Sequence, residues 1–272
     1  MTDVHWLQIG PQYFAGGDGT VGVFIESLRG LDELPDARAS LDRIPSAHGS
    51  FAPTDVWRDS LAVTVSGTIH GEDRADAERI RDALKNDLAG MLDMRFSDTT
   101  GIWNMRVRVD NVRPSDMGAW SSMIPFTIDM VAPDPVRYSD AVIRGPVGLP
   151  VREGGLVLPA AFPWDFGTSI RPTLEVVNSG SLPAYPIVRV TGSGSSLSVL
   201  GGPRRVEFGA WAGEFVIDNR QRRAFLNGAD VTRQLTRRDW QQVPVGQTYS
   251  FSFDAPGSSD AQMTVDYRIG VW

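Results

Sequence analysis

The chain has 272 residues, of which 42% are hydrophobic and 22% charged, values typical of a soluble globular protein with room for one large or two ordinary domains. The formal charge of −7 disfavours a nucleic-acid groove built on a basic face. There are no cysteines, which excludes disulfide frameworks and cysteine-based metal or redox sites, and no apolar run approaches the roughly 18 residues of a membrane span.

The first part of the chain combines a short apolar strand with a long irregular segment. Apolar residues over 21–25 follow a glycine-rich turn and predict a strand. Residues 29–57 show little periodicity and contain several prolines and glycines, so we expect a long arm there. A segment of this length in a compact domain usually has a function or lies against a partner.

Residues 61–92 carry the clearest local signals. Apolar and polar residues alternate over 61–69, which predicts a strand with one buried face. A helix is expected from Asp73, as its N-cap, to about residue 92, because apolar residues then recur at steps of three and four. The predicted buried stripe consists of Ala77, Ile80, Leu84, Leu88 and Met91.

Two further alternating strands, over 103–109 and 124–130, complete the N-terminal part. The sequence Pro133-Asp134-Pro135 then ends the sheet, because two prolines this close cannot continue a central ladder. Residues 1–135 are therefore expected to form a β-sandwich or split-barrel-like domain with one α-helix over about 73–92.

Residues 136–272 have an almost purely β pattern, with short apolar stretches separated by turn residues and no helical periodicity. This pattern predicts a sandwich or barrel, so the fold class is mainly β with two domains. The expected strand cores are residues 156–158, 174–177, 187–190, 197–200, 206–208, 215–217, 224–226, 249–253 and 263–271.

No motif indicates catalysis. The chain has no Gly-x-Ser-x-Gly elbow, and His5, His48 and His70 are far apart and lack metal-ligand spacing. We therefore predict no catalytic residue, metal ligand or cofactor-binding residue, while a hydrolase whose site follows no motif stays open as an alternative. Asp134, between two prolines, is interpreted as a turn former.

Four other features have competing interpretations. Trp211 and Glu214 are weak ligand candidates, because an aromatic ring beside a carboxylate can stack on a sugar and hydrogen-bond to it; the alternative is a turn with Trp211 packed locally. Trp164 is either an anchor into a neighbouring subunit or part of a local core. The basic clusters at 204–205 and 220–223 favour surface or interface pairing over phosphate binding.

Several short motifs together resemble the distal tail protein (Dit) family of long-tailed phages. The first is Asn178-x-Gly180 followed by Tyr185-Pro186, a buried strand and Gly192, and the second is the ending Leu-Asn-Gly-x-Asp-Val. The resemblance covers about 48–231 and is clearest over 131–231, beginning at the junction Val-Ala-Pro-Asp-Pro. The residues of the second motif that match are Asn227, Gly228 and Asp230.

The resemblance implies a structural subunit without enzymatic activity or cofactor. The N-terminal domain would form a homo-hexameric ring that continues the tail tube, and a galectin-like C-terminal β-sandwich would hold other components. The implied partners are the tail tube protein, the tail-tip hub and fibre or baseplate proteins, and DNA would pass through the lumen without specific binding. The implied location is the tail tip of the virion, after assembly in the host cytoplasm.

A second hypothesis from another class stays open. The C-terminal sandwich would then be a carbohydrate-binding module of a tail or secreted adhesin, and its partners would be host-surface glycans.

Overall fold

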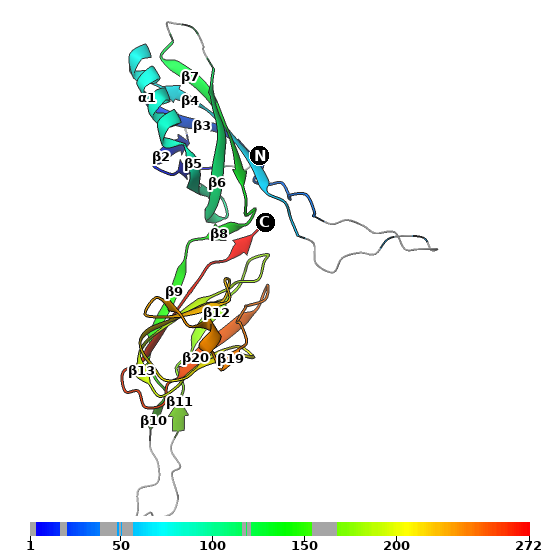
Figure 1. Cartoon of the computed structure of the whole chain (residues 1–272). Coiled ribbons are helices and arrows are strands. Elements are labelled where there is room, and N and C mark those ends of the chain that lie inside the picture. The colour runs from blue at the N-terminus through cyan, green and yellow to red at the C-terminus, as the bar shows by residue number, and fades with distance from the viewer. Residues whose placement is uncertain are drawn as a thin grey trace, which may run out of the picture. The chain divides into compact units, whose positions relative to one another are not determined.

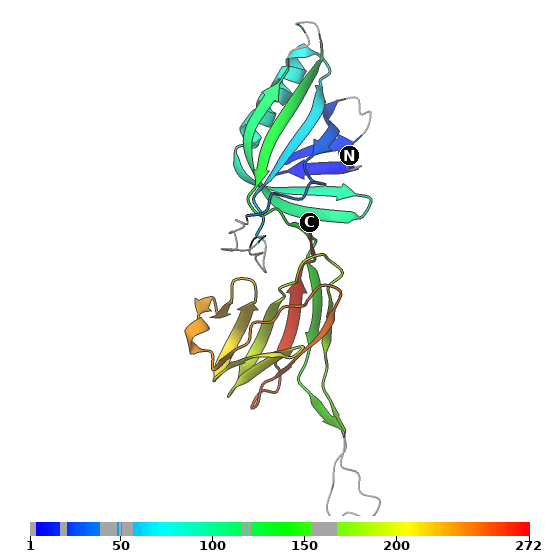
Figure 2. The ribbon, with the colours of Figure 1, turned by 90° about the vertical axis from the view of Figure 1, so that its right-hand side faces the viewer.

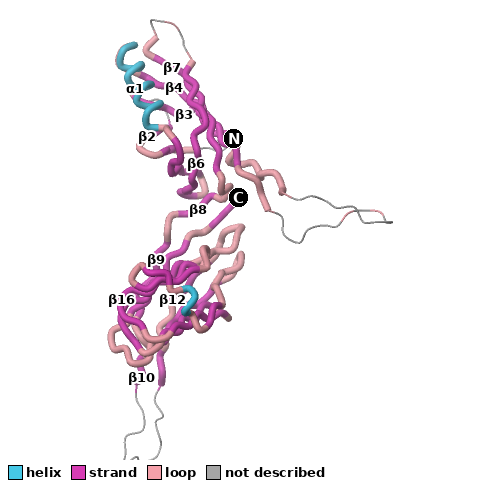
Figure 3. The backbone as a smooth tube through the Cα atoms, viewed as in Figure 1, coloured by secondary structure: helices cyan, strands magenta, loops and turns pink. Residues whose placement is uncertain are grey.

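The structure is a computed structural model, and it describes residues 4–16, 21–38, 48, 50, 57–115, 118, 121–153 and 168–272. Strands dominate the described residues (Figures 1 and 3), which confirms the mainly β class. The chain divides into two compact units, residues 1–140 together with Trp272 (unit 1) and residues 141–271 (unit 2). No helix in the described ranges combines the length and apolar character that crossing a bilayer requires.

Unit 1 is built on a closed barrel (Figure 2) whose strand order is β6-β5-β1-β2-β3-β4-β7, with β7 pairing back onto β6. The β2–β3 pair is parallel, and the other barrel pairs are antiparallel. A short eighth strand, β8, pairs with β6. The bounds are β1 Trp6–Ile9, β2 Gln12–Gly16, β3 Gly22–Arg29, β4 Leu61–His70, β5 Gly90–Asp98, β6 Gly101–Pro114, β7 Met123–Ala132 and β8 Arg137–Ser139.

The length of β6 explains why unit 1 closes instead of forming the expected sandwich or split barrel. This strand pairs with β5 over Gly101–Val109 and with β7 over Arg108–Pro114. Its register shifts between Val109 and Asn111, and such a bulge bends a strand and increases its twist. A single strand therefore joins both ends of the sheet.

The helix α1 (Arg74–Asp87) begins as predicted and ends earlier. The Asp73 carboxylate accepts a hydrogen bond from the Asp76 amide at 2.8 Å, as an N-cap does. The expected extension to about residue 92 is wrong, because Gly90 has a φ of +84° and β5 starts there. Met91 is consequently 45% exposed on a strand instead of buried on the helix.

One apolar core fills unit 1. Alternate residues of β4, such as Val63 and Val65, point inward and are buried, as the alternation predicted. Ala77 and Leu84 of α1 pack into the same cluster, so the helix covers the barrel beside β4 and β7.

Unit 2 contains two larger sheets and a two-stranded ribbon, β10–β11. The five-stranded sheet has the order β12-β20-β14-β15-β19, and the six-stranded sheet has the order β18-β17-β16-β13-β21-β9. Residues of both sheets, including Val199, Phe253, Phe215 and Val265, belong to one buried cluster.

The bounds in this part are β9 Val142–Val147, β10 Val151–Glu153, β11 Thr168–Ile170, β12 Leu174–Val177, β13 Ile187–Gly194, β14 Leu197–Gly201, β15 Arg204–Phe208, β16 Trp211–Asp218, β17 Arg223–Leu226, β18 Ala229–Asp230, the 3-10 helix η1 Thr232–Gln234, β19 Arg237–Arg238, β20 Thr248–Asp254, β21 Gln262–Tyr267 and β22 Gly270–Val271. The strand expected at 156–158 and Trp164 lie outside the described residues.

Candidate functional site

The side chain of Asn178 is buried in unit 2 and forms hydrogen bonds with three backbone groups. The Asn178 side chain is 1% exposed, and its amide donates to the carbonyls of Leu182 (2.8 Å) and Val243 (2.9 Å). Its oxygen accepts from the Gly180 amide at 3.1 Å. A Cβ at Gly180 would lie 2.4 Å from the Gly270 carbonyl oxygen, so only glycine fits there. These contacts suit the scaffold role predicted for Asn178 and Gly180, which stays a prediction.

A second buried network begins at the strand entry. The Pro186 carbonyl accepts from the Asn219 side chain at 2.6 Å, and the Asn219 oxygen accepts from the Gln241 amide at 2.8 Å. Gln241 is fully buried and donates to the Val199 carbonyl at 3.0 Å. The neighbouring Tyr185 is 39% exposed and so presents its ring at the surface.

The Asn227-Gly228 pair forms the two-residue turn between β17 and β18, with φ angles of +50° and +82°. Two positive φ angles match the hairpin turn that such pairs favour. The Asn227 side chain also donates to the Ala212 carbonyl and accepts from the Glu214 amide, both at 2.9 Å. The turn is therefore fixed against β16.

Asp230 and Gly192 also occupy structural positions. The Asp230 carboxylate accepts hydrogen bonds from Thr232, and these, with Arg223 and Arg233 nearby, hold the pKa of Asp230 below its ordinary value. Gly192 has a φ of +134°, and a Cβ there would lie 2.8 Å from the Cα of Ala261.

Trp211 and Glu214 do not share a surface. Trp211 is 4% exposed and belongs to the core of unit 2, while Glu214 is exposed, 3.5 Å from Arg189. Residues three apart on a strand point to opposite faces, which explains the separation. A sugar bound at Glu214 would have no indole beneath it, so the proposed site loses its stacking ring.

The histidines are not brought together. His5 and His48 are exposed, and His70 packs beside Phe24 with 4.9 Å between the ring centroids. Within the described ranges, no group of three or more histidine and carboxylate side chains is arranged to hold a metal ion. Asp134 accepts from the Val136 amide (3.3 Å) and the Tyr138 hydroxyl (3.0 Å), as a turn former does.

Among the carboxylates that the structure describes, the most enclosed is Asp98, which the sequence did not single out. It is 7% exposed and accepts from the amide (2.7 Å) and hydroxyl (2.6 Å) of Thr100, the Gly101 amide (3.0 Å) and the Trp103 indole (3.1 Å). Burial raises the pKa of Asp98, but these hydrogen bonds outweigh it and the pKa lies below its ordinary value. A charged carboxylate, one oxygen of which accepts all four hydrogen bonds, fixes the β5–β6 turn.

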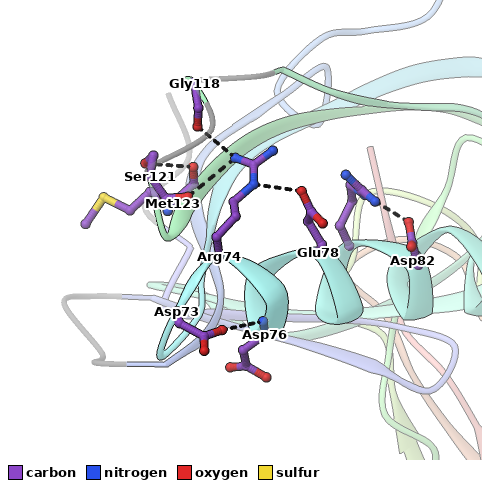
Figure 4. Close-up of polar contacts among 9 residues, drawn as sticks. Asp73, Arg74, Asp76, Glu78, Asp82, Gly118, Ser121 and Met123 are labelled. Atoms are coloured by element: carbon purple, nitrogen blue, oxygen red, sulfur yellow. Dashed lines mark hydrogen bonds and ion pairs between the residues drawn. The ribbon is translucent and has the colours of Figure 1, made fainter.

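Arg74 fixes the N-terminal turn of α1 to the segment before β7 (Figure 4). Its guanidinium donates to Glu78 at 2.8 Å and to the carbonyls of Gly118 (3.2 Å) and Ser121 (3.4 Å). The Met123 amide donates to the Ser121 hydroxyl at 3.1 Å. The helix is thus held by polar contacts at its start and by apolar packing along its length.

The main apolar surface of functional interest is the base of the predicted arm, residues 34–38 and 57–59 (the arm base). Two extended segments meet there in an isolated β-bridge, with the Arg38 amide donating to the Trp57 carbonyl at 2.7 Å. They leave the barrel after β3 and return before β4 (Figure 1). Leu34 is 54% exposed and Trp57 is 73% exposed. Large apolar side chains left this open are typical of a protein interface. The remainder of the arm, residues 39–47, 49 and 51–56, lies outside the described residues.

Comparison by sequence finds no matching family model and no matching curated protein. Comparison by structure finds the SPP1 Dit protein, described as a hub adsorption apparatus of phages that infect Gram-positive bacteria, with a TM-score of 0.67, 13% identity and coverage of 97% of this chain and 98% of that chain. It also finds the phage P2 baseplate in its activated conformation with calcium, with a TM-score of 0.51, 8% identity and coverage of 96% and 97%. The chain therefore has the fold of a phage distal tail hub protein.

Proposed function

We propose that this chain is a distal tail subunit of a long-tailed phage or a phage-derived particle. The observation that carries the proposal is the structural match to a Dit hub protein over 97% of this chain, through both units. A chance likeness of β-rich folds would be expected to match one unit only. The proposed role is structural and non-catalytic.

In this proposal unit 1 forms a homo-hexameric ring that joins the tail tube to the tail-tip hub. The arm base supplies an interface, because Trp57 and Leu34 are the kind of exposed side chains that subunit contacts bury. The proposed domains are the predicted ones, residues 1–135 and 136–272, and the arm over about 29–57 is proposed to reach a neighbouring copy. Unit 2 is proposed to be a galectin-like β-sandwich that holds fibre or baseplate proteins.

The charge distribution supports a lumen that does not hold DNA. Unit 1 contains 13 lysine and arginine residues against 22 aspartate and glutamate residues, a formal charge of −9, whereas unit 2 contains 13 against 11, a formal charge of +2. Phosphate groups bind surfaces rich in lysine and arginine, so an acidic ring favours passage over binding. The proposed location is the tail tip of the virion, with assembly in the host cytoplasm.

Electron microscopy of the purified chain tests the proposal. Negative-stain images should show six-fold rings with a central hole, and light scattering after size exclusion should give six times the chain mass. The tube protein is added as a second condition, because ring formation on a tail can depend on the preceding ring. A chain that stays monomeric under both conditions contradicts the proposal.

The carbohydrate-binding alternative has less support. Its aromatic member, Trp211, is in the core, so only Glu214 remains on the surface. The scaffold residues Asn178, Gly180, Tyr185, Pro186, Gly192, Asn227, Gly228 and Asp230 are proposed to shape unit 2 without contacting a ligand.

A further inference from the structure

A cluster of arginines lies at one edge of unit 2. Strand β18 is an edge strand of the six-stranded sheet, and β19 is an edge strand of the five-stranded sheet. The 3-10 helix η1 lies between them in the chain. Figure 2 shows η1 in orange on one side of this unit. Arg223, Arg233 and Arg238 come from β17, η1 and β19, and we call this set the arginine edge.

These three residues belong to different elements that lie next to one another. The Arg238 guanidinium donates to the Arg233 carbonyl at 3.0 Å. Asp230 pairs with Phe225 across the β17–β18 hairpin, so Arg223, two residues before Phe225, lies on the same face of that hairpin as Asp230. The Ala224 amide donates to the Thr232 hydroxyl at 2.9 Å, which places η1, and with it Arg233, beside β17. Asp230 and the three arginines are exposed.

The arginine edge has more positive charge than its neighbouring carboxylates neutralise. The Asp230 carboxylate accepts from the Thr232 amide, and Arg238 bonds the Arg233 carbonyl. The adjacent carboxylates have partners of their own, since Glu207 pairs with Arg205 at 3.2 Å and Asp239 with Arg237 at 2.6 Å. Over residues 204–238 the chain has eight arginines against four carboxylates, a formal charge of +4 in a protein whose total is −7.

We infer that the arginine edge binds the acidic unit 1 of a second copy of this chain. The observation that selects this partner is charge complementarity, because unit 1 has a formal charge of −9. In an assembly of identical copies, the arginine edge of one copy can contact unit 1 of its neighbour. Complementary charge of this kind raises association rates and fixes the register of a contact. Guanidinium groups also bind carboxylates with two parallel hydrogen bonds, which a lysine cannot do. The inference rests on the proposed ring, which is the assembly that brings the copies together.

The test is charge reversal in the full-length chain. R233E/R238E should weaken self-association, measured by sedimentation velocity in 50 mM NaCl, by at least about tenfold, and should flatten its dependence on salt. The matched control R144E/R268E makes the same charge change in unit 2, at exposed residues of β9 and just after β21, the opposite edge of the six-stranded sheet. It should leave self-association within about twofold of the wild type. Thermal unfolding of both variants verifies that each is folded.

The outcomes separate this inference from the proposed function. A wild-type chain that never assembles contradicts the ring itself. Rings whose salt dependence is the same in the wild type and in R233E/R238E overturn only the role of the arginine edge. Loss of heparin binding in R233E/R238E without any effect on self-association would also overturn it, by assigning the surface to polyanions. Aggregation of R233E/R238E with unchanged subunit affinity would mean that the arginines only protect an open strand edge.

Discussion

The indole N–H of Trp103 donates to the Asp98 carboxylate at 3.1 Å, across the turn that joins β5 to β6. The same oxygen accepts from Thr100 and Gly101, so one atom organises the entire turn. Because β6 goes on to pair with β7, the position of this hairpin determines how the barrel of unit 1 closes.

Asp98→Ala should destabilise unit 1 by about 1–3 kcal/mol at pH 7, because the turn loses the four hydrogen bonds that the buried carboxylate accepts. The pKa of Asp98 is lowered by folding, so its stabilisation is complete above the unfolded pKa of about 3.9 and is lost as the pH falls through the folded value. Urea unfolding from pH 7 down to pH 2 measures both effects. Asp98→Asn should remove this contribution to the acid dependence, and an unchanged dependence would contradict the assignment.

Leu84→Asp should unfold unit 1. Leu84 is 1% exposed, and a buried carboxylate without a partner costs several kcal/mol. Met91→Asp is the control, because Met91 is 45% exposed and the same change there should alter stability by less than about 1 kcal/mol. Circular dichroism during heating compares the two, and a folded, ring-forming Leu84→Asp variant would refute the packing of α1.

Asn178→Ala should destabilise unit 2 by about 1–3 kcal/mol, because the buried Asn178 side chain would lose its hydrogen bonds to the carbonyls of Leu182 and Val243. Asn111→Ala serves as the comparison, since Asn111 is exposed and its replacement should change the free energy of unfolding by no more than about 0.5 kcal/mol. Denaturant unfolding followed by fluorescence gives both values. Equal effects would remove the special role of the Asn178 turn.

Trp57→Ala should weaken ring assembly while leaving the stability of the isolated chain within about 0.5 kcal/mol. The reason is that a side chain 73% exposed contributes little inside its own subunit but can contribute much in an interface. Tyr13→Ala, at a residue 56% exposed on β2, is the matched aromatic control. Light scattering after size exclusion reads out assembly, and rings of unchanged stability would exclude Trp57 from the contact.

Trp211→Ala should destabilise unit 2 by about 3–5 kcal/mol, the usual cost of removing a large aromatic side chain from a core. Any loss of glycan binding in that variant would therefore reflect unfolding. Glu214→Gln keeps the fold and tests binding directly on a glycan array. Binding by the wild type that disappears in Glu214→Gln would revive the carbohydrate hypothesis.

Local features of this fold were predictable from the sequence where they depend on period or on a single residue. The alternation along β4 and the capping role of Asp73 follow from side-chain direction and hydrogen-bonding chemistry. The end of α1 was missed because the left-handed conformation of Gly90 outweighed an apolar period that continues to Met91. Closure of the barrel depends on the bulge in β6, a tertiary feature that no local pattern indicates.

Several tertiary features were harder to predict than the main strands. Strand β19 consists of Arg237 and Arg238, which have no apolar alternation, and the sequence offers no sign that it pairs with β15. Gln241 belongs to no motif, and only the fold places it in a buried network. The burial of Trp211 could have been predicted, because Trp211 points to the same face of β16 as the apolar residues Phe215 and Ile217.

Strand β9 has a consequence for the order in which the chain folds during synthesis. It pairs with β21, so residues 142–147 must wait for residues 262–267 before their ladder can form. The barrel strands of unit 1 all lie before residue 133, so the ribosome releases them first and they can close without the rest. The edge of unit 2 at β9 stays open for more than a hundred residues of translation, and during that interval a growing chain is most exposed to pairing with a wrong strand.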